Sequence, residues 1–285
     1  MSEPPVAAVN PPEIQKPKFV SLPLAGRESF GASYHVLTFD HPEGSGALPG
    51  QFAMVRGAEW GESPLLPRPM SYLSGGDSPS ILIKVLGEGT ARMARAEPGE
   101  RYFLLGPLGR PWRPPTPGRR PLLVGGGVGI APLLFFCRWL VERGFSPLSL
   151  YGGRSEHDLP LSRELSKISD LQVTTEDGSG GARGRVTDVL EKLLQPDMEV
   201  YTCGPHRMMA LVADICDRHD IVCEASLETP MACGYGVCLG CAVPTTEGRF
   251  LYACVEGPCV DARRVDWRPG AGAFDRAEDA ACPSA

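Results

Sequence analysis

Four cysteines near the end of the chain have the spacing of a metal centre. Cys233, Cys238, Cys241 and Cys254 form the pattern C-x4-C-x2-C-x12-C. Three closely spaced cysteines with a distant fourth are the ligand arrangement of plant-type 2Fe-2S clusters, whereas structural zinc sites usually carry two C-x2-C or C-x2-H pairs. The spacing therefore favours a 2Fe-2S cluster bound by these four residues, with a zinc site or unreactive thiols as the alternatives.

The residues around these cysteines fit a cluster. Gly234, Gly236 and Gly240 lie between the ligands, and glycine allows a loop to wrap so closely that its N–H groups can face the anionic sulfurs. Cys259 follows Cys254 by five residues. We expect Cys259 to be a buried apolar residue that binds no metal.

Composition restricts the setting of this site. The 285 residues include ten cysteines, and the N-terminal sequence MSEPPVAAVNPPEIQKPK lacks the basic start and apolar stretch of a secretion signal. We therefore expect a cytoplasmic protein, in which clustered cysteines bind metals more often than they form disulfides. A net charge of −6 and the lack of an eighteen-residue apolar run predict that the chain binds no nucleic acid and spans no membrane.

Two patterns of hydrophobicity predict the elements that position the cysteines. Between residues 18 and 109, short β-rich runs such as SYHVLTFD and SILIKVLG alternate with turns, which is typical of an antiparallel barrel. Beyond the proline- and arginine-rich stretch at residues 110–120, strands alternate with helices, for example PLLVGGG followed by a helix over 130–143. That alternation predicts a parallel sheet of the doubly wound α/β type.

The chain is therefore expected to be multidomain. The proline-rich stretch suits a linker, which places one boundary near Arg113. The expected units are a disordered extension at residues 1–16, an antiparallel β-barrel at 17–112, a doubly wound α/β domain at 113–227, a small cysteine module at 228–267 and a tail at 268–285.

Two turns of the α/β domain have the composition of a phosphate site. In VGGGVGIAP, glycines stand between an apolar strand and a helix, where backbone N–H groups and the helix dipole favour a phosphate; they are Gly125, Gly126, Gly127 and Gly129. The pattern is not the complete G-x-G-x-x-G fingerprint, so a tight connection without a ligand is the alternative. A later strand ends at Cys203, before Gly204 and Pro205, at the same predicted sheet edge. Cys203 either points into the crevice there or is a small buried residue.

The predicted barrel carries two polar turns. Arg68 begins the segment RPMS, and its guanidinium is able to hold a diphosphate through two hydrogen bonds. Thr90 ends the segment GEGT and is expected to cap the short helix that follows. A solvated arginine and an ordinary helix cap are the alternatives for each residue taken alone.

Taken in chain order, RPMS, GEGT, GPLG, GGGVGIAP, CGPHRMM and the cysteine array resemble the ferredoxin reductase family with a C-terminal iron-sulfur module. The likeness covers residues 18–267. The cysteine array with its EGP sequel at 256–258 is similar to the electron-transfer subunits of class 1B dihydroorotate dehydrogenase. One departure is Met70, where many reductases have a tyrosine that stacks on the flavin, although an aliphatic residue is usual in the dihydroorotate branch.

The resemblance implies three cofactors and the residues that bind them. FAD would lie on the barrel, with Arg68 on its diphosphate and Ser71 near its ring; the implied residues are Arg68, Pro69, Met70, Ser71, Leu82, Ile83, Lys84, Gly89 and Thr90. NAD would lie on the turns of the α/β domain, at Gly125, Gly126, Gly127, Gly129, Cys203, Gly204 and Pro205. Arg154 leaves NADP open, because an arginine in that position could accept a 2′-phosphate. Cys233, Cys238, Cys241 and Cys254 match the ligands of the family's 2Fe-2S cluster.

The resemblance also implies a function. NAD exchanges two electrons as a hydride, a 2Fe-2S cluster exchanges one, and a flavin between them exchanges either. Electrons would pass from an FMN-containing catalytic subunit of dihydroorotate dehydrogenase through the cluster and FAD to NAD, in pyrimidine biosynthesis and in a heterotetramer with two of each chain. No catalytic base is expected in this chain, because none of its five histidines lies beside a recognisable nucleophile. A hydrogenase or a ferredoxin-dependent transhydrogenase is the alternative partner, and a zinc-binding interaction protein is the alternative class.

Overall fold

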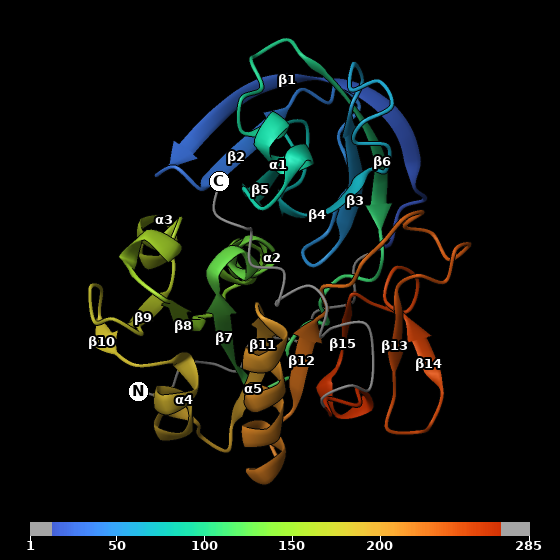
Figure 1. Cartoon of the computed structure of the whole chain (residues 1–285). Coiled ribbons are helices and arrows are strands. Elements are labelled where there is room, and N and C mark those ends of the chain that lie inside the picture. The colour runs from blue at the N-terminus through green and yellow to red at the C-terminus, as the bar shows by residue number, and fades with distance from the viewer. Residues whose placement is uncertain (1–12, 269–285) are drawn as a thin grey trace.

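The computed structural model describes residues 13–268, which form a closed barrel, a seven-stranded sheet flanked by helices and a small cysteine-bearing unit (Figure 1). Most of the extension expected at residues 1–16 lies outside the described residues, as do residues 269–285 of the expected tail, which include Cys282. Across the described part of the chain, no helix is long and apolar enough to cross a membrane. The architecture confirms the predicted combination of an antiparallel barrel, an α/β sheet and a small third unit.

Six antiparallel strands close the barrel in the order β1-β2-β5-β4-β3-β6. They are β1 (Lys18–Phe30), β2 (Tyr34–Phe39), β3 (Phe52–Gly57), β4 (Arg68–Ser74), β5 (Ser80–Lys84) and β6 (Arg101–Leu108). The long β1 pairs with β6 through its first half and with β2 through its second half, which closes the barrel. Helix α1 (Glu88–Met93) follows β5, and its Met93 is fully buried in the barrel core.

The seven-stranded sheet has the order β10-β9-β8-β7-β11-β12-β15. Its strands are β7 (Arg120–Gly126), β8 (Leu148–Gly153), β9 (Asp170–Thr175), β10 (Ala182–Arg183), β11 (Met198–Cys203), β12 (Cys223–Ser226) and β15 (Cys259–Asp261). The flanking α-helices are α2 (Ile130–Val141), α3 (Ser162–Ser166), α4 (Val186–Leu193) and α5 (His206–Arg218). Short 3-10 helices are η1 (Gly127–Gly129), η2 (Glu156–Asp158) and η3 (Ala262–Arg264).

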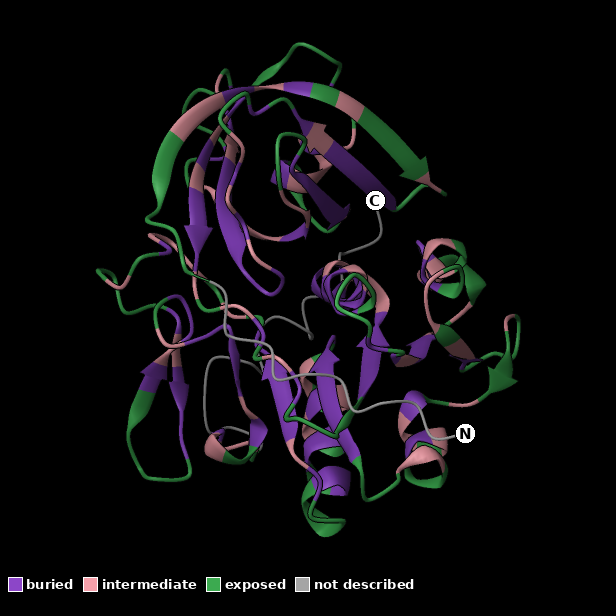
Figure 2. Ribbon diagram, turned by 180° about the vertical axis from the view of Figure 1, so that it is seen from behind, coloured by how far each residue is buried: buried purple, intermediate pink, exposed green. Residues whose placement is uncertain are grey.

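Apolar side chains point alternately to the two faces of the central strand β7, which explains why helices cover both faces of the sheet. On β7, Leu122 and Val124 belong to a core that includes residues of α4 and α5, whereas Leu123 belongs to a second core with α2 and α3. Both cores are buried in the interior, as the burial colouring shows (Figure 2). Helix α2 also contacts the barrel, where the Arg138 guanidinium donates to the Leu73 carbonyl oxygen at 3.2 Å. The doubly wound part therefore holds one helix directly against the flank of the barrel.

The cysteine-bearing unit is not independent of the sheet. Its strand β15 pairs antiparallel with β12. The sheet is therefore mixed, whereas the sequence predicts a wholly parallel one. The unit also contains a two-stranded hairpin, β13 (Ala242–Pro244) and β14 (Phe250–Tyr252). Val243 and Leu251 of this hairpin share one core with Val124 and with Met54 of the barrel. All three units therefore meet in a continuous apolar core.

Candidate functional site

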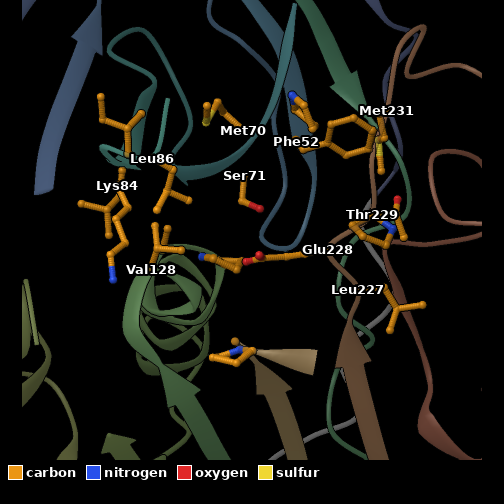
Figure 3. Close-up of a pocket in the computed structure, with 18 of the residues that line it drawn as sticks. Phe52, Met70, Ser71, Lys84, Leu86, Val128, Leu227, Glu228, Thr229 and Met231 are labelled. Carbon is orange, nitrogen blue, oxygen red and sulfur yellow. The ribbon is translucent and has the colours of Figure 1, made fainter. Parts of the chain in front are cut away.

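A cavity of about 390 Å³ lies where the three units meet (Figure 3). From the barrel it is lined by Phe52, Pro69, Met70, Ser71, Leu82, Ile83, Lys84, Leu86 and Thr90. From the sheet and its helices it is lined by Val128, Ala131, Pro132, Gly204, Pro205, His206 and Met209. The segment that leads into the cysteine unit contributes Leu227, Glu228, Thr229, Pro230 and Met231, and Pro258 completes the lining. A largely apolar cavity of this size with few polar groups is typical of a cofactor site.

The structure brings together most of the barrel residues singled out in the sequence. Pro69, Met70, Ser71, Leu82, Ile83, Lys84 and Thr90 all line the cavity. Arg68 lies next to it, in a shallow hollow shared with Leu65, Leu66, Pro230 and Met231. Gly89 lies against Arg68, since a Cβ atom at position 89 would come within 2.4 Å of the Arg68 Nε atom. The two polar turns of the barrel therefore form one site, and a side chain at position 89 would displace the Arg68 guanidinium from its present place.

Thr90 has a different local role from the one expected. Helix α1 begins at Glu88, so Thr90 lies inside its first turn rather than at its cap. The Thr90 hydroxyl oxygen accepts hydrogen bonds from the N–H groups of Leu86 and Gly87 at 3.0 and 3.2 Å. These bonds fix the turn that carries Gly89 beside Arg68.

The glycine-rich turns divide into a lining part and a supporting part. Gly204 and Pro205 line the cavity, whereas Gly125, Gly126, Gly127 and Gly129 do not. A Cβ atom at Gly126 would lie 2.9 Å from the Pro205 Cδ atom, so this turn packs against a lining residue. A Cβ atom at Gly129 would lie 2.4 Å from the Cys203 carbonyl oxygen, so the two turns are in direct contact. The Cys203 side chain is buried and does not line the cavity. Of the two alternatives for its side chain, the structure therefore has the small buried residue, and burial raises the pKa of its thiol well above the ordinary value.

Several lining residues escaped the sequence analysis. Among them are Val128, which lies on the same side of the cavity as the predicted Lys84, and Thr229 and Met231, which lie on the other side (Figure 3). The segment from Leu227 to Met231 follows β12 directly, and ligands bind beyond the carboxyl ends of such strands. A strand at CEAS, had it been recognised, would have predicted this contribution.

The four cysteines occupy two neighbouring loops of the third unit. The sulfur atoms of Cys241 and Cys254, both buried, lie 3.1 Å apart. The Cys233 sulfur accepts a hydrogen bond from the N–H group of Cys238 at 3.4 Å, and the Cys238 side chain is exposed. Within residues 13–268, no three His, Cys, Asp or Glu side chains are already gathered into a metal-binding set. The structure therefore brings Cys254 against Cys241, the last cysteine of the first loop, and Cys238 against Cys233 within that same loop.

The loop that carries Cys233 has the backbone of an anion site. Gly234 and Gly236 have φ angles of +80° and +88°, as their predicted role in wrapping the loop requires. Burial alone would raise the pKa of Cys233, but N–H groups of Cys238, Tyr235 and Val237 lower it to about 6. Burial and the neighbouring Cys241 instead raise the pKa of Cys254 to about 12. A loop that directs several N–H groups at a thiolate fits the donor chemistry of an iron-sulfur cluster.

Strand β3 connects the cavity with this loop. Phe52 lines the cavity, and Met54, two residues along the same strand, lies against the cysteine loop. A Cβ atom at Gly234 would come within 2.5 Å of the Met54 Cγ atom. One strand of the barrel therefore contributes side chains both to the cavity and to the packing against the cysteine loop.

Comparison with solved structures identifies the class to which this fold and site belong. The structure of an NADH-dependent reduced ferredoxin-NADP oxidoreductase superposes with a TM-score of 0.77 at 28% identity, covering 86% of this chain and 90% of that one. A ferredoxin NADP⁺ reductase of Neisseria gonorrhoeae shares the fold at 18% identity with a TM-score of 0.59, covering 70% of this chain and 91% of that one. The protein is an oxidoreductase of the ferredoxin reductase-like class.

Sequence comparison identifies the family within that class. Residues 228–266 match the iron-sulfur cluster binding domain of dihydroorotate dehydrogenase B, and residues 123–214 match an oxidoreductase NAD-binding domain. The probable dihydroorotate dehydrogenase B (NAD⁺) electron transfer subunit of Methanopyrus kandleri is 40% identical over 216 residues, 74% of this chain and 78% of that protein. The corresponding subunit of Bacillus caldolyticus is 36% identical over 225 residues, 76% and 86% of the two chains. This chain belongs to the family of dihydroorotate dehydrogenase B electron transfer subunits.

Proposed function

We propose that this chain carries electrons between NAD(H) and an FMN-containing catalytic subunit of dihydroorotate dehydrogenase, using bound FAD and a 2Fe-2S cluster. The observation that carries the proposal is the cavity at the junction of barrel, sheet and cysteine unit, with β3 leading from it to the cysteine loop. FAD supplies the exchange between a two-electron hydride carrier and a one-electron centre. The protein must therefore hold three redox groups close together.

The barrel residues are the proposed FAD site. Arg68, with Gly89 and Thr90 beside it, would hold the diphosphate, because a guanidinium forms paired hydrogen bonds with phosphate oxygens. Pro69, Met70 and Ser71 of β4 and Leu82, Ile83 and Lys84 of β5 would hold the ring system in the cavity. Lys84 would do so through its backbone and aliphatic stem, because its ammonium lies against Asp158. The apolar side chains among them exclude water from the ring, which strengthens every polar contact made there.

The turns of the sheet are the proposed NAD site. Gly204 and Pro205 line the cavity opposite the barrel and would face the nicotinamide. The glycine turn at the N-terminus of α2 would let the backbone approach the dinucleotide closely; its residues are Gly125, Gly126, Gly127 and Gly129. Cys203 would act through its backbone, since its carbonyl oxygen supports Gly129 from behind.

Cys233, Cys238, Cys241 and Cys254 are the proposed cluster ligands, and the surface around them is the proposed docking face for the catalytic subunit. Four apolar side chains, which we call the apolar rim, surround the exposed Cys238: Tyr235, Val237, Leu239 and Val255 are 56%, 70%, 50% and 47% exposed. Exposed apolar groups gathered in this way mark protein contacts. A partner seated on the rim would bring its own redox centre close to the cluster. One such contact joins one copy of each chain, so the proposed assembly with two of each chain requires a further contact between two such pairs.

An anaerobic titration with NADH tests this proposal on the purified chain. We expect the visible absorption of both an oxidised flavin and an iron-sulfur cluster, and bleaching of both bands by NADH, because β3 packs against the cysteine loop and also lines the cavity. A colourless protein, or flavin bleaching with an unchanged cluster, would contradict the proposal. Reduction of added ferredoxin without any effect of the catalytic subunit would favour a transhydrogenase-like partner instead.

A further inference from the structure

Asp158 joins the sheet to two strands of the barrel through a single carboxylate oxygen. It ends the 3-10 helix η2, which follows β8. Its Oδ1 atom accepts hydrogen bonds from the Tyr34 hydroxyl at 2.8 Å and from the Lys84 ammonium at 3.1 Å. Tyr34 begins β2 and Lys84 ends β5, and the Lys84 ammonium also lies 5.0 Å from the centre of the Tyr34 ring.

This contact is charged and within reach of solvent. The Lys84 and Asp158 side chains retain 32% and 22% of their exposure. Burial alone would raise the pKa of Asp158, but hydrogen bonds from Tyr34 and Lys84, with the charges of Lys84 and Arg154, lower it. Asp158 is therefore an anion at neutral pH. A partly exposed ion pair of this kind exchanges partners at little cost in free energy.

The contact lies beside the glycine-rich turn. A Cβ atom at Gly127 would lie 3.7 Å from the Tyr34 hydroxyl oxygen, and Lys84 lines the cavity. Lys84 and Arg154 are thus cations next to the turn where the dinucleotide's diphosphate is proposed to bind, and Asp158 is the carboxylate that faces them. In the structure, the charge of Lys84 is already neutralised by an anion of the chain itself.

We propose that Asp158 is a built-in counter-anion that competes with the diphosphate of NAD(H) for Lys84, and so sets the affinity of the nucleotide site. The inference rests on the proposed NAD site. A dinucleotide that enters draws Lys84 away from Asp158. The free energy lost when the Lys84–Asp158 ion pair breaks reduces the net free energy of dinucleotide binding. Tyr34 keeps η2 in place because its hydrogen bond to Asp158 does not depend on Lys84.

The variant Asp158→Asn separates this competition from a purely structural role. Asparagine keeps an oxygen that accepts from the Tyr34 hydroxyl but removes the charge that holds Lys84. We expect the Kd for NAD⁺, measured by calorimetry on the oxidised protein with FAD and cluster bound, to fall about two- to fivefold. If Asp158 only clamps the two units together, the loss of the ion pair raises Kd or leaves it unchanged, and the proposal is overturned.

Two further variants complete the experiment. Glu156→Gln removes the same charge from an exposed position two residues away on η2 and is expected to leave Kd within about 1.5-fold. Lys84→Met is expected to weaken NAD⁺ binding. When Asp158→Asn is added to Lys84→Met, the affinity for NAD⁺ should not increase, because the ammonium for which Asp158 competes is gone. An equal gain with and without Lys84 overturns the proposal. Absence of NAD⁺ binding by every form, wild type included, overturns the proposed function together with this inference.

Discussion

The sulfur atoms of Cys241 and Cys254 lie 3.1 Å apart, although twelve residues separate them in the sequence. Cys241 directly precedes β13 and Cys254 stands just after β14, so the hairpin returns the second cysteine to the first. Ala242 pairs with Tyr252 in this hairpin, and the Ala253 N–H donates to the Cys241 carbonyl oxygen at 3.1 Å. The length of the hairpin therefore explains the interval between the third and fourth cysteines of the motif.

Replacing Cys254 with serine should remove the cluster. Serine lacks the soft thiolate that iron requires, so we expect the iron content of the purified chain to fall to near zero. Cys259→Ser is the matched control, because Cys259 is equally buried five residues further on and its sulfur lies 3.7 Å from the Gly50 carbonyl oxygen. Iron analysis and the visible spectrum measure both variants. Loss of iron in Cys259→Ser with iron retained in Cys254→Ser would refute the ligand set.

Gly234→Ala should loosen the cysteine loop from the barrel. The position has a φ angle of +80°, and its new Cβ atom would lie 2.5 Å from the Met54 Cγ atom. We expect a loss of about 2 to 4 kcal/mol of unfolding free energy, from backbone strain and the collision together.

Gly248→Ala is the control that measures how much of the stability loss in Gly234→Ala comes from backbone strain alone. Gly248 lies in the same unit with a φ angle of +75°, but a Cβ atom added there would have nothing within 4 Å. We expect a loss of only about 1 kcal/mol at this position. Denaturant unfolding monitored by far-ultraviolet circular dichroism measures both variants, and equal losses would contradict the proposed packing of Gly234 on Met54.

A charge placed in the apolar rim should weaken the complex with the catalytic subunit. Val237 is 70% exposed next to Cys238, and glutamate there would be desolvated on docking. We expect Val237→Glu to raise the Kd for the catalytic subunit about tenfold or more, as measured by surface plasmon resonance. Leu211→Glu alters an exposed apolar residue on α5, away from the rim, and should bind normally. Equal weakening by both variants would show that the rim is not the docking face.

Glu224 should make the stability of the fold fall as pH rises. Its carboxylate is buried beside Arg113, whose N–H donates to it at 3.1 Å. Burial, only partly offset by Arg113, raises the pKa of Glu224 to about 7. Because the folded state holds this proton more tightly than the unfolded state, the unfolding free energy decreases as pH rises from about 4.5 through 7.

Glu224→Gln should abolish that decrease. Glutamine keeps an oxygen for the Arg113 N–H but carries no proton that titrates, so the variant should gain on the order of 1 to 3 kcal/mol relative to wild type between about pH 5 and pH 8. Urea unfolding at several pH values measures the slope. Glu59→Gln, at an exposed position, is the control. A wild-type slope in Glu224→Gln would contradict the assignment of this titration.

Local patterns predicted the elements of the fold and most of the cavity. Alternation in SILIKVLG placed Leu82, Ile83 and Lys84 on a barrel strand, and the structure has them lining the cavity. The turn before α2 was recognisable because glycine, strand and helix signals are adjacent in the sequence. Such features depend on neighbouring residues, which a single sequence contains in full.

Contacts between distant segments were not predictable in the same way. The pairing of β15 with β12 depends on three residues, 259–261, whose pattern is too short to indicate a strand. Likewise, the bond between Tyr34 and Asp158 joins residues 124 positions apart, and nothing local to either one indicates it. Cys203 is buried in a core that also holds Leu123 of β7 and Cys259 of β15, which is a tertiary effect.

The most direct test of the proposed electron path is its complete reconstitution. The purified chain, loaded with FAD and iron, is mixed with an FMN-containing catalytic subunit of dihydroorotate dehydrogenase, and NADH formation from NAD⁺ and dihydroorotate is followed by absorbance. We predict NADH formation only when both proteins are present, and its loss when the chain carries Cys254→Ser. Oxidation of dihydroorotate by this chain alone, or undiminished NADH formation by the Cys254→Ser mixture, would contradict the proposed route through the cluster.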